Sequence, residues 1–95
     1  MIRIDRTGER TWRAWLGTGD ASSLTQLDVA EFASASAARS WVEQRLLATG
    51  TRLGAPVYGS VDSGRYVGAR WEPAAVPGLD ADLVDGRIRW RRPGA

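Results

Sequence analysis

The sequence contains no histidine, no cysteine and no lysine, and all 13 of its basic residues are arginine. These absences exclude a Ser-His-Asp triad, a cysteine or lysine nucleophile and the usual zinc ligands, because such sites need the missing side chains. No disulfide can form, so cysteine usage does not indicate a redox compartment. We therefore predict a domain that is not an enzyme and that takes no metal and no cofactor.

Long apolar runs are also missing. No stretch approaches the roughly 18 consecutive apolar residues that a membrane-spanning helix needs. The segment Met1–Arg6 alternates apolar and charged residues and lacks the continuous apolar stretch of a signal peptide. These features favour a cytoplasmic protein with no membrane contact.

The overall composition is ordinary for one globular domain, with 95 residues of which 43% are hydrophobic and 25% charged. The arginines are nearly balanced by 11 acidic residues, so the formal net charge is only +2, whereas nucleic-acid-binding domains usually carry a larger excess. Asparagine is absent as well as lysine, and Ala, Gly and Arg are frequent, which indicates a bacterial genome of high GC content. Arginine in place of lysine is then weak evidence for guanidinium-specific recognition.

Alternating polarity predicts strands in the N-terminal part of the chain. Met1–Arg6 and Thr11–Leu16 both alternate, and residues 7–10 between them include a glycine, so these segments are expected to form a hairpin. We expect a loop at residues 17–23, from its Gly, Ser and Asp content, and a third strand at Leu24–Phe32.

The next segment predicts the single helix. Ser34 or Ser36 can cap its N-terminus, because a serine oxygen accepts a hydrogen bond from a free backbone N–H. A stripe with the i, i+3, i+4, i+7, i+8 spacing follows, with one polar member. Its residues are Ala38, Trp41, Val42, Arg45 and Leu46. Gly50 is expected in the left-handed position just past the last turn.

The C-terminal half predicts two more hairpins. Their strands are Val57–Val61, Arg65–Trp71, Leu79–Val84 and Arg87–Arg91. A turn at residues 62–64 would join the first pair. Asp85-Gly86 would join the second pair, since both residue types tolerate a positive φ.

The predicted order is three strands, one helix and three strands, give or take one strand. Hairpins around a single helix indicate an α+β domain, with an antiparallel sheet of five to six strands and one amphipathic helix packed on one face. Trp41 and Leu46 of the helix are expected to contact the sheet. The expected sheet partners are Ile4, Trp12, Val67 and Trp90.

Arginine and aromatic side chains gather on the other predicted sheet face. Alternation places Arg3, Arg13, Trp15, Tyr66, Arg70, Arg87 and Arg89 there. Such a set can form a protein interface, where Trp, Tyr and Arg are favoured anchors, or it can stack bases and hold phosphates. A third interpretation is that the arginine stems simply cover the sheet. The candidate contacts for a partner or for nucleic acid are Arg13, Trp15, Tyr66, Arg70, Arg87 and Arg89.

Acidic residues precede the C-terminal arginines. Asp80, Asp82 and Asp85 come just before the run that starts at Arg87, and we expect them to neutralise it across the hairpin. The same acids do not predict a calcium loop, because the position of the closing glutamate is held by Arg91.

Three segments resemble a known DNA-binding module. They are residues 8–15 (Gly-Glu-Arg-Thr-Trp-Arg-Ala-Trp), 32–34 (Phe-Ala-Ser) and 37–43 (Ala-Ala-Arg-Ser-Trp-Val-Glu). Together they resemble the AP2-like module at the N-terminus of phage-type tyrosine integrases, in which three strands precede a helix and the sheet lies on DNA. The resemblance covers about the first half of the chain and implies that Arg10 and Arg13 face DNA. The third strand, usually basic in that family, is acidic here.

From these observations we predict a small accessory domain that binds a protein partner or itself. The contacts would come from the arginine and aromatic face or from an exposed edge strand. The alternative hypothesis is a nucleic-acid-binding module that uses the same arginines. Binding of that kind would weaken steeply with salt, because phosphate contacts release counterions.

Overall fold

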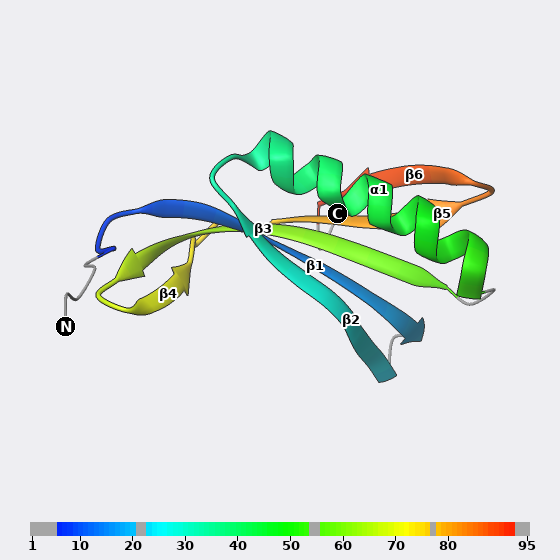
Figure 1. The fold of residues 1–95 in the computed structure, drawn as a ribbon, viewed down its shortest axis with the longest axis horizontal. Coiled ribbons are helices and arrows are strands. Elements are labelled where there is room, and N and C mark those ends of the chain that lie inside the picture. The colour runs from blue at the N-terminus through cyan, green and yellow to red at the C-terminus, as the bar shows by residue number, and fades with distance from the viewer. Residues whose placement is uncertain (1–5, 21–22, 54–55, 77, 93–95) are drawn as a thin grey trace.

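The computed structural model describes residues 6–20, 23–53, 56–76 and 78–92. Six strands and one helix make up this part of the chain (Figure 1). In chain order they are β1 (Arg10–Asp20), β2 (Ser23–Phe32), α1 (Ala35–Leu53), β3 (Val57–Val67), β4 (Arg70–Pro73), β5 (Leu79–Val84) and β6 (Arg87–Arg91). The predicted α+β class is confirmed: one helix packs on one face of a six-stranded antiparallel sheet.

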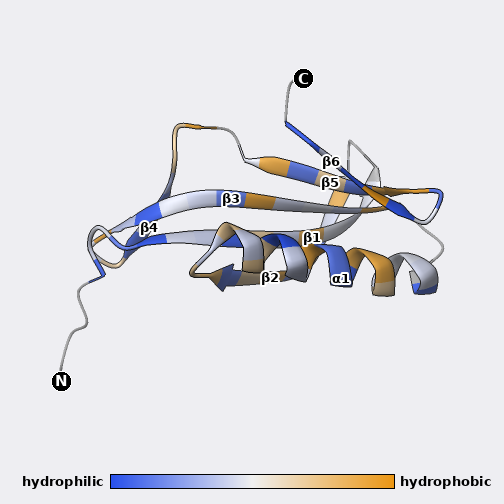
Figure 2. Cartoon of the chain, turned by 90° about the horizontal axis from the view of Figure 1, so that it is seen from above, coloured by the Kyte–Doolittle hydropathy of each residue, from blue (hydrophilic) through white to orange (hydrophobic). Residues whose placement is uncertain are grey.

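The strands of this sheet pair in the order β2-β1-β3-β5-β6, and every pair is antiparallel. β3 lies at the centre. One of its edges pairs with β1 over residues 57–65. Its other edge is divided, with residues 58–61 paired to β5 and residues 64–67 paired to β4. Both views show the β4 end of the sheet reaching beyond the first turn of α1 (Figures 1 and 2).

The first hairpin of the described chain connects β1 to β2. The expected loop at residues 17–23 is wrong for most of its length, because β1 continues to Asp20 and β2 begins at Ser23. Gly17 belongs to β1, where it pairs with Gln26 and Tyr58, and the ring of Trp15 lies across it where a Cβ atom would collide. The predicted turn at residues 7–10 is present, but the strand expected before it lies almost wholly outside the described residues.

The predicted turn at residues 62–64 is also wrong. β3 runs through this segment without interruption, held by its pairing with β1, and the chain turns instead at Gly68, where φ is +65°. Gly64 is needed for another reason: the indole of Trp71 lies against its backbone and leaves no room for a side chain. By contrast, the predicted turn at Asp85-Gly86 is confirmed, with φ values of 52° and 75°.

The helix begins where its cap was expected. The backbone N–H of Ala37 donates to Ser34 Oγ at 3.1 Å, which satisfies one of the free donors of the first turn. The end differs from the prediction, because α1 continues past Gly50 to Leu53. Gly50 faces the side chain of Leu83 at a distance too short for a Cβ atom, so this glycine permits close packing of α1 on β5.

The core lies between α1 and the sheet. Three of the predicted stripe residues, Ala38, Val42 and Leu46, are fully buried, while the side chain of Arg45 is 54% exposed. They pack on Ala14, Leu16, Val57, Val61 and Ala81 of the sheet, and Trp12, Phe32, Trp41, Leu83, Ile88 and Trp90 surround them. Val67, expected under the helix, is instead half exposed, because α1 does not reach that end of β3. Ile4 lies outside the described residues.

Within the described ranges, no helix combines the length and the apolar character that crossing a membrane would require.

Candidate interaction face

The face of the sheet that α1 leaves uncovered, called here the helix-free face, is assigned by strand register. Trp12, Ala14 and Leu16 of β1 pack toward α1, so alternation directs Arg13 and Trp15 to the other side. Residues paired in register with Arg13 and Trp15 lie on the same face, and so does every second residue along each paired strand. Of the six candidate contacts, Arg13, Trp15, Tyr66, Arg87 and Arg89 lie on this face.

Arg70 does not lie on the helix-free face, contrary to the prediction. The two-residue turn at 68–69 pairs Tyr66 with Trp71 and Val67 with Arg70. Trp71 therefore shares the face of Tyr66, and Arg70 points to the opposite side, where its guanidinium lies 3.0 Å from Glu72. Arg3, also expected on this face, lies outside the described residues.

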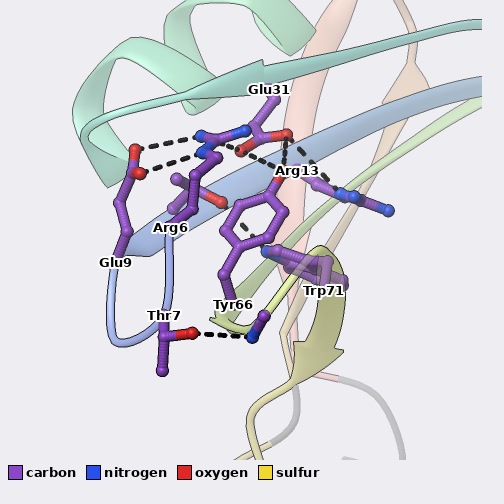
Figure 3. A network of polar contacts seen from close by, with 9 residues as sticks. Arg6, Thr7, Glu9, Arg13, Glu31, Tyr66 and Trp71 are labelled. Carbon is purple, nitrogen blue, oxygen red and sulfur yellow. Dashed lines mark hydrogen bonds and ion pairs between the residues drawn. The ribbon is translucent and has the colours of Figure 1, made fainter. Parts of the chain in front are cut away.

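Glu31 of β2 joins most of the polar contacts at one end of the helix-free face (Figure 3). The Tyr66 hydroxyl donates to both carboxylate oxygens, at 2.7 and 2.9 Å. The guanidinium of Arg6 donates to Glu31 at 3.2 Å and to Glu9 at 2.9 Å, and it lies 3.9 Å above the Tyr66 ring. Arg13 stands 3.9 Å from the same carboxylate. The tyrosine is thereby fixed at its hydroxyl and on its ring face. Because Tyr66 is only 6% exposed, it supports the face from beneath and is not itself an accessible contact, contrary to the prediction.

These contacts determine the protonation of Glu31. Partial burial alone would raise the pKa of this carboxyl. Hydrogen bonds from Tyr66 and Thr11, together with the two nearby guanidinium charges, outweigh that effect and hold the pKa below its usual value. Glu31 is therefore an acceptor at neutral pH and keeps the cluster in one arrangement.

Trp71 is packed between a glycine and an arginine. Its indole lies on the backbone of Gly64. The Arg13 guanidinium lies over the ring, 4.3 Å from its centre, in a cation–π contact. The indole N–H donates to Thr11 at 2.9 Å (Figure 3). An aromatic ring is thus held flat against the open sheet, at a position that the sequence predicted only as a strand end.

A second cluster surrounds Asp82 of β5. Arg89 donates to both of its oxygens, at 2.9 and 3.2 Å, and Arg91 lies 3.3 Å away. Hydrogen bonds from Arg89 hold the pKa of Asp82 below its usual value. The neutralisation expected across this hairpin is present for these two arginines, whereas Arg87 pairs in register with Val84 and not with an acid.

A shallow hollow of about 210 Å³ lies between the two clusters. Its floor includes Trp15, Tyr58, Ser60 and the side chain of Leu24. Trp15 is oriented by a hydrogen bond from its indole N–H to Gln26 at 3.1 Å. The hollow therefore offers aromatic and aliphatic side chains beside the charged residues Asp80 and Arg91.

The charges on the helix-free face cancel. The described charged residues there are Arg6, Arg13, Arg87, Arg89 and Arg91, with Glu9, Glu31, Asp62, Asp80 and Asp82. Arginines and carboxylates are equal in number, and most of them are already joined to each other.

Asp62 differs from the other acids of this face. Partial burial of its carboxyl and the charge of neighbouring Asp80 raise its pKa.

Within the described residues, no group of three or more acidic side chains is arranged to hold a metal ion.

Alternation along the strands was sufficient to predict Arg13, Trp15 and Tyr66, but it missed Arg6, Glu31 and Trp71. Glu31 was detectable in principle, because it stands opposite Arg13 once the β1–β2 register is known. Placing Trp71 on this face required knowing that the chain turns at residues 68–69.

In comparisons with protein-family models, curated proteins and solved structures, the chain matches none of them.

Proposed function

We propose that this domain is a non-enzymatic accessory module that binds a protein partner, or a second copy of itself, through the helix-free face. One observation carries the proposal: aromatic rings and guanidinium groups are held in fixed positions on an open sheet surface without net charge. The proposal includes the cytoplasmic location expected from the sequence.

Fixed side chains favour recognition of a protein. Arg13 is held over Trp71, and Arg89 is held on Asp82, so binding would immobilise few additional rotamers. Tryptophan, tyrosine and arginine are the residues that most often dominate binding energy at protein interfaces. The hollow beside Trp15 would accept an apolar side chain of the partner.

Nucleic acid is the second candidate ligand. Arg87 supports it, because this arginine makes no ion pair with the described residues, and Trp15 has a ring on which a base could stack. The cancelled charge of the face argues against it, since phosphates would compete with carboxylates already bonded to Arg13 and Arg89. The integrase-like hypothesis belongs here, although alternation along β1 directs Arg10 and Arg13 to opposite faces.

The test is capture by the immobilised domain from an extract of the cells that encode it. Three forms are compared: the unchanged domain, a face variant with Trp15→Ala and Arg89→Ala, and a control with Val76→Ala and Arg52→Ala. We expect a protein that the first and third forms retain and the face variant loses. Equal retention by the face variant, or capture of nucleic acid that disappears steeply with salt, would contradict the proposal.

A further inference from the structure

The outer edge of β2 differs from the other exposed strand edges of the described sheet. Among the described residues, β2 pairs on one side only, with β1, and its ten residues contain no proline. It carries three exposed apolar side chains: Leu24, Leu27 and Val29 are 52%, 42% and 51% exposed. Proteins usually protect a free edge with charge, proline or short length, because unpaired backbone groups attract another strand.

The remaining edges carry such protection. β6 presents Arg87, Arg89 and Arg91, and β4 has four residues and ends in a proline. β2 has partial protection: a register shift beside Leu27 bends it once, Asp28 and Glu31 add two charges, and the Val29 N–H donates to Asp28 Oδ1 at 2.9 Å. The other outward backbone groups of residues 28–32 have no strand beside them in the described sheet.

Hollows flank this edge on both faces of the sheet. The one on the helix side measures about 250 Å³ and is lined by Leu16, Leu27, Asp28, Arg45, Thr49 and Arg52. The one on the helix-free side measures about 260 Å³ and is lined by Arg13, Val29, Ala30 and Glu31. A strand added beside β2 would direct alternate side chains into the two hollows, as in recognition by strand addition.

Except for Arg52, the charges around these hollows are already paired within the chain. Asp28 lies 3.8 Å from Arg45, and Glu31 is bonded to Arg6 and Tyr66. The helix-free hollow therefore offers no free charge, and the helix-side hollow offers Arg52 alone. A strand with spaced apolar side chains fits beside this edge, and β2 supplies one through Leu24, Leu27 and Val29, while its two acids are those already paired above.

We propose that β2 pairs antiparallel with β2 of a second copy of this chain. The contact is isologous: Leu27 and Val29 of each copy line its own hollows and also contact the hollows of the other copy. A two-fold axis perpendicular to the sheet relates the copies, since that operation makes edge strands antiparallel. The sheet then continues through both copies, with both α1 helices on one side and both helix-free faces on the other.

The first test is the mass in solution by light scattering, measured over a range of protein concentrations. The edge variant carries Leu27→Lys and Val29→Lys. The control carries Leu47→Lys and Val67→Lys, whose wild-type side chains are 44% and 51% exposed on other elements and so match the edge pair closely. We expect dimers of the 10.3 kDa chain for wild type and control, and dimerisation weakened about 100-fold or more in the edge variant. A monomeric wild type at millimolar concentration, or an edge variant that stays dimeric, would overturn the proposal.

A second test does not depend on lysine being tolerated at these sites. The chain has no cysteine, so single substitutions to cysteine along β2, including Gln26→Cys and Ala30→Cys, report proximity without background. Under mild oxidation at least one β2 position near the two-fold axis should form a disulfide-linked dimer, because the Cβ atoms must approach to about 4 Å. Val67→Cys serves as the control. If it cross-links as readily as the β2 positions, the pairing is wrong.

The outcome is separable from the proposed function. The variant with Arg87→Ala and Arg89→Ala changes the helix-free face on β6, at the other end of the strand order from β2, so it should remain dimeric. If the edge variant becomes monomeric and still captures the partner, the edge and the face are independent surfaces.

Discussion

At the scale of single residues, Glu31 shows how this domain fixes its polar surface. One carboxylate accepts hydrogen bonds from Tyr66 and Arg6, and it is close to Arg13. Tyr66 is 6% exposed, so its hydroxyl has little access to water as an alternative partner. A buried hydroxyl that donates to a carboxylate contributes more to stability than a typical neutral hydrogen bond.

Removing this hydroxyl should therefore be costly. We expect Tyr66→Phe to lower the free energy of unfolding by about 1–2 kcal/mol, measured by urea denaturation. The control is Tyr58→Phe, because the Tyr58 hydroxyl makes no hydrogen bond with the described residues. A loss for Tyr66→Phe no larger than that of the control would show that the Glu31 cluster does not stabilise the fold.

Asp62 gives a prediction with the opposite sign. Partial burial and the charge of Asp80 raise the pKa of Asp62 in the folded state, so its ionised form destabilises the fold. Asp62→Asn should raise stability at neutral pH. The gain should shrink as the pH falls through the raised pKa toward the ordinary value of 3.8, because the carboxyl is then protonated in both states. Urea denaturation at several pH values measures this, and a gain that stays constant down to pH 3 would contradict it.

At the scale of elements, glycines and turns explain most differences between prediction and structure. Period-3.6 and period-2 patterns were sufficient for α1, β2, β5 and β6, because a single core face imposes those periods. Gly50 and Gly64 were misassigned because each is required by a distant side chain, Leu83 or Trp71, which no local pattern contains. The error at Gly64 then affected the site: the true turn at 68–69 reverses the alternation, so Trp71 replaces Arg70 on the helix-free face.

Gly59 tests the close approach of α1 to the sheet. Its Cα faces the side chain of Val42 at a distance that excludes a Cβ atom. We expect Gly59→Ala to lower the free energy of unfolding by about 1–3 kcal/mol, because the added methyl overpacks the core. Ser63→Ala, on the same strand, is the control. If thermal or urea denaturation finds both variants equally stable, α1 is not in close contact with β3 at this position.

At the scale of the whole molecule, charge is distributed unevenly between the two sides of the sheet. The helix-free face is balanced, whereas Arg10, Arg52 and Arg65 make no ion pair with described residues and lie away from it. Among the described residues, the excess of arginines over acids therefore lies on the helix side and at its margins. Aromatic rings held on the neutral side and arginines left unpaired on the other favour a protein as the ligand of the helix-free face.

The five tryptophans allow the most direct measurement of this claim, because each indole N–H gives one signal in a ¹⁵N–¹H correlation spectrum. Trp15 and Trp71 lie on the helix-free face, whereas Trp41 belongs to α1 and Trp12 and Trp90 pack against the core beneath it. We predict that the captured partner shifts the signals of Trp15 and Trp71 and leaves those of Trp41 and Trp90 unchanged. Shifts confined to Trp41 and Trp90 would contradict the assignment of the helix-free face as the binding surface.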